Sequence, residues 1–263
     1  MNDILGKTGS IWSSAHPAGQ KTFIGGHRGS SIGATENTLA AVKLAIAEGA
    51  DFIETDLRLT RDGIPVAFHD ANLERLHGDP RSVAELDLAE LRAIHPQVMT
   101  IAEALEAAAG HVSVLLDTKS SEPQALRHSI EVLRPWLGGG TVAFGTRSMA
   151  ASELIRQELP GCPVLGLYQD YSDYPALAAM GGQWARLWEE DASPTAIAEL
   201  QELGLKVIIM AGRHGANAVG LISPDTLATL LEWHPDAVML NDVRTGAAVR
   251  DATPRQPNFT QNS

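Results

Sequence analysis

The feature that most constrains the fold is a regular alternation of short apolar runs and helical patterns along the 263-residue chain. Apolar residues recur at helical spacing in 36–49, and two further helical patterns, 193–204 and 223–233, open on Ser-Pro, a pair that favours a helix start. Eight runs have the composition of buried β-strands. They are 22–26, 51–57, 112–117, 141–145, 163–168, 184–188, 206–210 and 237–241.

Strands that alternate with helices and are apolar on both faces predict a parallel α/β sheet. Eight such units within about 220 residues fit a closed (β/α)8 TIM barrel better than a doubly wound open sheet, which stays the alternative. We expect one barrel domain over 23–250. An N-terminal tail or cap over 1–22 and a loose, polar C-terminal tail over 251–263 complete the chain.

A short insert is expected after the second strand, because about 60 residues separate Asp51 from Val112, whereas other strand starts lie about 20–30 residues apart. Within this stretch Asp62-Gly63 is a hairpin signal between two extended runs. Residues 64–69 should therefore fold back antiparallel on the second strand. That return would bring His69 level with Glu54 and Asp56.

The overall charge argues against polyanionic partners. The formal net charge is −12, so the chain repels nucleic acid and anionic membranes, and we expect neither nucleic acid nor stable membrane association. A single cysteine, Cys162, excludes an intramolecular disulfide and suits a reducing compartment, and no long apolar run resembles a signal peptide. We expect a cytoplasmic protein that acts on a small molecule; the oligomeric state is not indicated.

Two carboxylates share one face of the second strand. Glu54 and Asp56 are two residues apart, so both point into the barrel mouth if they lie near the carboxyl end of the strand. Adjacent carboxylates with only oxygen ligands favour Mg²⁺ or Ca²⁺ over zinc. The alternative is a solvated strand end, in which Arg58 and Arg61 pair with these acids.

Other polar residues stand at the ends of neighbouring strands. His27 follows two glycines at the end of the first strand, His69 ends the return strand, and Asp117 and Lys119 end the third barrel strand. The carboxyl ends of barrel strands meet on one face, where active sites are found. Acids, bases and cations should therefore converge on one rim.

These segments together resemble the glycerophosphodiester phosphodiesterase family. The resemblance rests on "GHRG", "ENT", "ADFIETDLRLTRDGIPVAFHD", "TIAEAL" and "LLDTK", and covers residues 23–119 clearly. Beyond them, "AVMLND" stands where the family has a last-strand motif ending in Thr-Asp. The resemblance implies a TIM-barrel hydrolase that cleaves small phosphodiesters with a divalent metal.

The resemblance also implies roles for individual residues. His27 and His69 become the general acid and base, and Arg28 and Lys119 would bind the phosphate. Glu36 would support the turn at "GHRG", or would simply be an acid near a helix start. The metal ligands implied are Glu54, Asp56 and Asp117.

The chain departs from the family pattern in three places. Asp117 stands where the family usually has glutamate, and the insert after His69 is short. The family's Trp-Thr motif in the seventh strand is replaced by "VIIMAGRHG", so Arg213 or His214 could rebuild that wall of the pocket. We expect a pocket wide enough for a head group bulkier than glycerol, with Trp188 or Arg213 in contact with it.

Several alternatives stay open. Compact relatives of the sphingomyelinase D type release a cyclic phosphate by intramolecular transfer, and others cleave sugar phosphodiesters of the agrocinopine type. A diverged, non-catalytic barrel could bind phosphorylated ligands. A barrel lyase could use Lys119 as a Schiff-base amine, although it would not need the two histidines.

Overall fold

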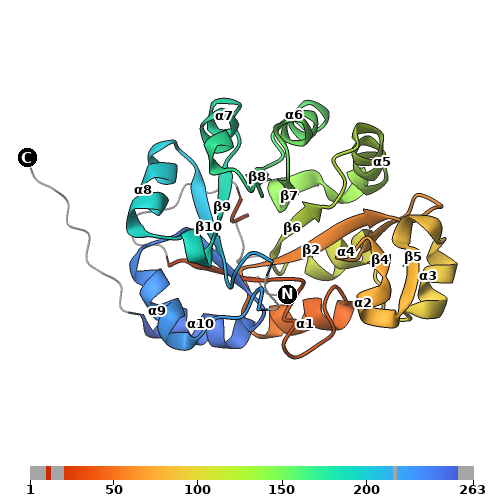
Figure 1. Cartoon of the computed structure of the whole chain (residues 1–263), viewed down its shortest axis with the longest axis horizontal. Helices are drawn as coiled ribbons and strands as arrows, with labels where there is room; N and C mark the ends of the chain where they lie inside the picture. The colour runs from red at the N-terminus through yellow and green to blue at the C-terminus, as the bar shows by residue number, and fades with distance from the viewer. Residues whose placement is uncertain (1–9, 13–20, 216–217, 254–263) are drawn as a thin grey trace, which may run out of the picture.

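Eight parallel strands close into a barrel, which confirms the predicted fold class. The computed structural model describes residues 10–12, 21–215 and 218–253. The strands hydrogen-bond in the order β1-β11-β10-β9-β8-β7-β6-β2, and pairing of β1 with β2 closes the ring (Figure 1). The strands are β1 (Phe23–Gly26), β2 (Phe52–Leu59), β6 (Ser113–Thr118), β7 (Val142–Thr146), β8 (Val164–Gly166), β9 (Trp184–Trp188), β10 (Lys206–Met210) and β11 (Ala237–Leu240).

Helices surround the barrel and alternate with its strands (Figure 1). They are α1 (Leu39–Ala47), α4 (Ile101–Ala108), α5 (Pro123–Leu133), α6 (Met149–Glu158), α7 (Tyr174–Ala179), α8 (Pro194–Glu202), α9 (Pro224–Glu232) and α10 (Val243–Ala252). Short 3₁₀ turns η2 (Arg134–Trp136), η3 (Gly138–Gly140), η4 (Tyr171–Asp173) and η5 (Glu189–Asp191) lie in the connections.

Local sequence signals set several helix starts. Ser193 and Ser223 cap α8 and α9, and each accepts a hydrogen bond from a backbone amide three residues on, with proline at the first helical position. Helix α1 begins later than its pattern suggested, because Asn37 has a left-handed backbone (φ 56°) and Thr38 is the N-cap. Glu36 therefore lies outside the helix.

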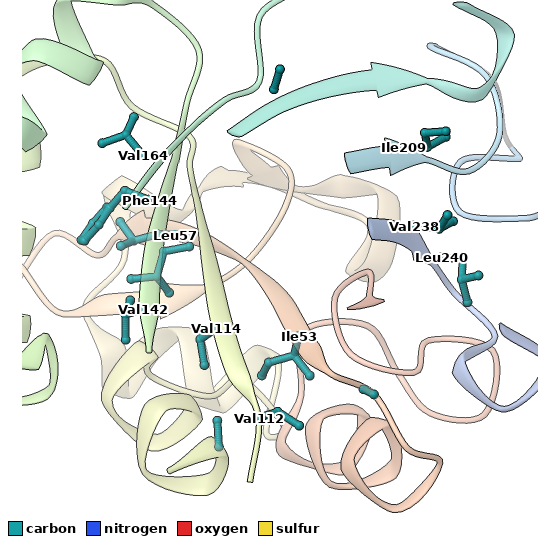
Figure 2. Packing of buried hydrophobic residues seen from close by; sticks show 14 of the residues in the cluster. Ile53, Leu57, Val112, Val114, Val142, Phe144, Val164, Ile209, Val238 and Leu240 are labelled. Atoms are coloured by element: carbon teal, nitrogen blue, oxygen red, sulfur yellow. The ribbon is translucent and has the colours of Figure 1, made fainter. Parts of the chain in front are cut away.

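The alternation of side chains along the strands divides the apolar core into two parts. Ile53, Val114 and Phe144 point outward and pack beneath the helices (Figure 2). Phe52, Leu115 and Trp184 point inward and fill the barrel. Charged residues that share the inward face are therefore held inside the barrel, above this apolar floor.

A tryptophan from before the barrel packs into the inward-facing cluster. The Trp12 ring lies edge-on to Phe52 and Trp184, with centroid separations of 5.2 and 5.3 Å, and its indole N–H donates to the Thr141 carbonyl. These ring contacts fill the interior of the barrel with apolar side chains. The rest of the predicted N-terminal segment, residues 1–9 and 13–20, lies outside the described residues, as does 254–263 of the C-terminal tail.

The insert after β2 is a small unit with its own core. Strand β3 (Pro65–Ala67) runs antiparallel to β2, with Leu57 opposite Ala67, which confirms the predicted hairpin. The apolar side chains of Val66, Phe68 and Leu91 belong to a separate buried cluster. The remaining elements are β4 (Asn72–Leu73), α2 (Glu74–His77), β5 (Asp79–Ser82), η1 (Val83–Glu85) and α3 (Leu88–Ile94).

None of the helices within the described part of the chain is long and apolar enough to span a membrane.

Candidate active site

A cavity of about 540 Å³ opens at the carboxyl ends of the barrel strands. Its wall takes residues from β2, β6, β9, β10 and β11 and from the segments after β1, β2, β6, β7, β8, β10 and β11, so parts of the chain far apart in sequence meet there. Leu115, Leu167, Met210 and Met239 form its apolar floor. All of the implied catalytic, phosphate-binding and metal-binding residues line the cavity or lie buried against it.

Three carboxylates gather at one side of this cavity. Oxygen atoms of Glu54, Asp56 and Asp117 lie within 4.8 Å of one another, and all three residues are buried. Asp56 and Asp117 are register partners on the neighbouring strands β2 and β6. The Oδ1 atom of Asp117 is buried and has no hydrogen-bond partner. An all-oxygen donor set with an unsatisfied buried oxygen fits a hard divalent cation.

The three carboxylates differ in their electrostatic surroundings. Burial raises the pKa of Glu54 well above its ordinary value, and the charges of Asp56 and Asp117 add to this effect. Burial alone would also raise the pKa of Asp56, but Lys119 and Arg28 beside it lower that pKa below its ordinary value. Asp56 is thus held as the charged carboxylate by its two cations, whereas no cation among the described residues forms an ion pair with Glu54.

Asn37 holds Asp56 in place. Its amide nitrogen donates to Asp56 Oδ2 at 2.6 Å, and its amide oxygen accepts from the Asp56 backbone N–H and from the Thr55 hydroxyl. The left-handed backbone at Asn37 turns the side chain toward the strand instead of continuing helix α1. Asn37 belongs to the quoted "ENT" motif but received no role from the sequence.

His27 is oriented by a residue from the last barrel strand. Its Nδ1 lies 2.8 Å from Asn241 Oδ1, and the Asn241 amide nitrogen donates to the Val219 carbonyl. Because the asparagine oxygen accepts, Nδ1 carries the proton and Nε2 keeps a lone pair. Burial lowers the pKa of His27 to about 4, with the nearby Arg28 charge adding to the effect. The ring is therefore neutral near pH 7.

His69 is held through its backbone and its ring. Its Nδ1 lies 2.7 Å from Asp70 Oδ1, and Arg58 donates from Nε and Nη2 to the His69 carbonyl at 3.0 and 2.7 Å. Arg75 contacts Asp70 and Glu36, and so links the insert to the loop after β1. Burial lowers the pKa of His69, although Asp56 acts in the opposite direction.

Two cationic side chains, Lys119 and Arg28, contact the cluster of carboxylates. Lys119 Nζ lies 2.6 Å from Asp56 Oδ1 and 2.5 Å from Asp117 Oδ2. Arg28 has a left-handed backbone (φ 57°), its N–H donates to Glu54 Oε2, and its guanidinium contacts Glu36 and Asp56. Burial would lower the pKa of Lys119, but Asp56 and Asp117 raise it above its ordinary value. Both predicted phosphate-binding cations are thus charged and lie beside the carboxylates.

Comparison with known proteins agrees with this geometry. The model of the "Glycerophosphoryl diester phosphodiesterase family" matches residues 27–245. The chain belongs to this family. Among curated members, "Glycerophosphodiester phosphodiesterase 1" of Bos taurus is 41% identical over 70 residues, 27% of this chain and 21% of that protein. A glycerophosphodiester phosphodiesterase of Caldanaerobacter subterraneus is 42% identical over 72 residues, 27% of this chain and 30% of that protein.

Solved structures match over much more of the chain and show the same fold. The glycerophosphodiester phosphodiesterase of Thermotoga maritima superposes with a TM-score of 0.73 and 19% identity, over 88% of this chain and 99% of that one. An Oleispira antarctica phosphodiesterase, solved with the product sn-glycerol-3-phosphate, gives a TM-score of 0.75 and 22% identity, over 88% and 97% of the two chains. At these identities the likeness shows the fold alone.

The aspartate at position 117 is the first departure from the pattern of the glycerophosphoryl diester phosphodiesterase family. Although its side chain is one methylene shorter than glutamate, a carboxylate oxygen still lies within the 4.8 Å cluster. Its other contacts are Lys119 and Arg147, the latter from the loop after β7. Arg147 also lines the cavity, and it was missed because a single arginine after a strand carries no motif.

The third departure, in the segment "VIIMAGRHG", lies in the cavity wall formed by the end of β9 and the loop after β10. Trp188 and His214 line the cavity, with ring centroids 5.3 Å apart, as expected for a rebuilt wall. Arg213, the other expected contact, is exposed and does not line the cavity, because the chain turns at the left-handed Gly212 (φ 83°). Tyr168 is buried, and its hydroxyl contacts Ser152, so it packs in the core.

A second cation that the motifs of this family did not indicate lies inside the barrel. Arg186 on β9 lines the cavity and is only 3% exposed. The alternation in "WARLW" does place it on the inward face with Trp184 and Trp188, so the strand pattern contained a signal. An isolated charge within a strand belongs to no motif, so the pattern gives its direction but not a functional role.

Proposed function

We propose that this chain hydrolyses small phosphodiesters to a phosphomonoester and an alcohol, with His27 and His69 as the acid-base pair. The observation that carries the proposal is that both histidines line one cavity with Glu54, Asp117 and Lys119. Family membership supports the same activity. Because the curated relatives match over less than a third of their length, the activity of this chain rests on its own site.

The residues of the chain meet the needs of phosphodiester hydrolysis. Water must lose a proton as it attacks phosphorus, and the leaving alkoxide must gain one. His27 presents a lone pair at Nε2, because Asn241 fixes the proton on Nδ1. His69 is oriented by Asp70 in the same way. One histidine, as the neutral ring, takes the proton from water at its Nε2 lone pair, and the other, as the imidazolium, gives its Nε2 proton to the departing alkoxide.

Cationic groups neutralise the phosphate. Lys119 and Arg28 lie beside the carboxylate cluster and can donate to the non-bridging oxygens. Glu54, Asp56 and Asp117 would hold a divalent cation, which we propose to be Mg²⁺ or Ca²⁺. When bound, this ion supplies positive charge that polarises the phosphoryl group.

The proposed substrates are glycerophosphodiesters first and sugar phosphodiesters second. The Oleispira antarctica relative was solved with sn-glycerol-3-phosphate, which supports a glycerol phosphate product. The short insert and the Trp188 wall support a head group bulkier than glycerol. We also propose a cytoplasmic location, which rests on the composition with a single cysteine.

The test is a panel of glycerophosphodiesters and sugar phosphodiesters, assayed with Mg²⁺ or Ca²⁺, with products identified by phosphorus NMR. We expect a phosphomonoester and a free alcohol. A cyclic phosphate as the final product would instead support the sphingomyelinase D-like reaction. Binding without any turnover would support the non-catalytic barrel, and borohydride trapping of a carbonyl substrate on Lys119 would support the lyase.

A further inference from the structure

Arg186 is a buried cation without an acidic partner. Its Nη2 donates to the carbonyls of Leu167 and Tyr168 at 3.2 and 2.9 Å. Its Nε and Nη1 atoms are shielded from solvent and have no hydrogen-bond partner. A guanidinium carries five N–H donors, so several remain unsatisfied. Unsatisfied buried donors are rare in folded proteins, and a buried charge is expensive unless it is paired.

The other cationic side chains of the cavity wall are paired. Among the described residues, Arg28, Arg75, Lys119 and Arg147 each contact at least one carboxylate within 3.2 Å. Arg186 has no such contact with a carboxylate of the described residues. Its guanidinium lies over the Trp188 ring, with Cζ 4.5 Å from the ring centroid. The positive charge of Arg186, which lines the cavity, is therefore not balanced by an ion pair among the described residues.

The position of Arg186 separates it from the catalytic groups. Strand β9 is four places from β2 in both directions around the eight-strand ring, so it lies across the barrel from Glu54 and Asp56. Along β9, Arg186 lies between Trp184, which packs on Trp12, and Trp188 at the mouth. Because Arg186 and the carboxylate side line the same cavity, a phosphodiester bound at the carboxylates can place one of its two ester substituents on the Arg186 side.

We propose that Arg186 binds an anionic group on the alcohol moiety of the substrate. The preferred substrates would then be phosphodiesters whose alcohol carries a carboxylate or a second phosphate, in place of choline or ethanolamine alone. This inference rests on the proposed function. The Trp188 ring covers one side of the guanidinium, and the apolar floor around it strengthens the charge interaction by excluding water.

The alternative is a purely structural role. Arg186 holds two carbonyls at the end of β8, and loss of these hydrogen bonds would disturb the loop after that strand. Such a disturbance would weaken all substrates alike, whereas loss of an anion subsite would weaken only those that carry the anion. The ratio between matched substrates therefore separates the two roles.

The experiment compares two matched pairs of substrates with the Mg²⁺-loaded protein. Glycerophosphoserine differs from glycerophosphoethanolamine by one carboxylate, and glycerophosphoinositol 4-phosphate differs from glycerophosphoinositol by one phosphate. We expect the wild type to prefer the more anionic member of at least one pair by about tenfold or more in kcat/KM. The pair that shows the preference identifies the anion.

Arg186→Met should reduce this preference to about twofold or less, and Arg186→Lys should keep part of it. Arg134→Met, the same change at an exposed arginine, is the control and should leave the ratio unchanged. Thermal unfolding of each variant reports any structural damage. Equal loss on both members of each pair, or a wild type without preference, would overturn the inference.

Dissociation constants for the same compounds, measured by calorimetry, give the ratio independently of turnover. If no compound is hydrolysed but the anionic members bind more tightly only when Arg186 is present, the proposed function fails and this inference stands. If the compounds are hydrolysed and the ratio does not depend on Arg186, the inference alone fails.

Discussion

On the side of the cavity formed by β1, β2 and β6, charges of both signs are interleaved, whereas the side formed by β9 and β10 is aromatic and apolar around a single guanidinium. Lys119 bridges Asp56 and Asp117 on the first side. On the second, Arg186 lies against Trp188 and forms no ion pair with an acid among the described residues. The charges of Asp56 and Asp117 on the first side are paired within the protein, whereas the charge of Arg186 on the second side has no ion pair among the described residues.

This difference indicates that the two sides of the cavity have different functions. Buried charge networks are rigid when their members satisfy one another, which suits groups that must hold reacting atoms in place. An apolar wall with one unsatisfied polar group selects among ligands, because it favours the molecule that supplies the missing partner. Changes on the first side should therefore alter the rate for all substrates, and changes on the second should alter selectivity.

The largest effect is expected from removal of the divalent metal. Treatment with EDTA, followed by dialysis, should abolish activity on every substrate, and Mg²⁺ or Ca²⁺ should restore it, because three adjacent carboxylates need a cation to hold an anionic substrate. Metal content by mass spectrometry and thermal unfolding with and without the ion give readouts besides activity. Full turnover by protein shown to be metal-free would contradict the metal assignment.

Removal of either histidine should have the next largest effect. His27→Ala and His69→Ala should each lower kcat by at least about 10²-fold for all substrates, because one proton transfer loses its donor or acceptor. His128→Ala, which removes an exposed histidine of the α5 helix, is the matched control. A variant at 27 or 69 with near wild-type kcat and an intact fold would remove that residue from the mechanism.

A smaller effect, again on kcat for all substrates, is expected from a change at Asp70. Asp70→Asn should lower kcat by about tenfold, because the ring of His69 loses its charged partner. The hydrogen bond that the Asp70 carboxylate accepts from His69 Nδ1 acts to raise the pKa of His69, so its loss should lower that pKa further. A limb of the pH-rate profile that reports His69 protonation should then move to lower pH.

Asp79→Asn is the control for this change, since Asp79 pairs with Arg81 in the insert and does not line the cavity. An unchanged pH-rate profile and kcat in Asp70→Asn would show that Asp70 does not act through His69.

A substitution of Trp188 is expected to have the smallest effect on rate. It should change the selectivity between substrates. Trp188→Ala should change the ratio of kcat/KM between glycerophosphodiesters and sugar phosphodiesters by about threefold to tenfold, because the ring forms the wall opposite the carboxylates. Trp233→Ala, a change outside the cavity, should leave the ratio as it was. An equal loss of kcat/KM on both substrate classes would show that Trp188 affects the rate for all substrates, and would contradict the proposed difference between the two sides of the cavity.

Much of this site could be predicted from local sequence. The eight apolar runs fixed the number of strands, and Asp62-Gly63 indicated the hairpin that returns His69 to the rim, because periodicity and turn chemistry act over a few residues. The spacing of Glu54 and Asp56 placed both on the inward face for the same reason. The catalytic and phosphate-binding roles of the predicted residues stay predictions.

Only the tertiary structure decided which distant residues support this framework. Asn241 orients His27 across 214 positions of sequence, and Arg147 contacts Asp117 from the loop after the next barrel strand. The turn at Gly212 directs His214 rather than Arg213 to the cavity. Closure of the barrel brings the ends of eight strands to one mouth, and the pairing there depends on register and loop geometry. Register and loop geometry are not encoded in any short segment. The alternation along β9 therefore indicates that Arg186 points inward, but not that it forms no ion pair with a carboxylate.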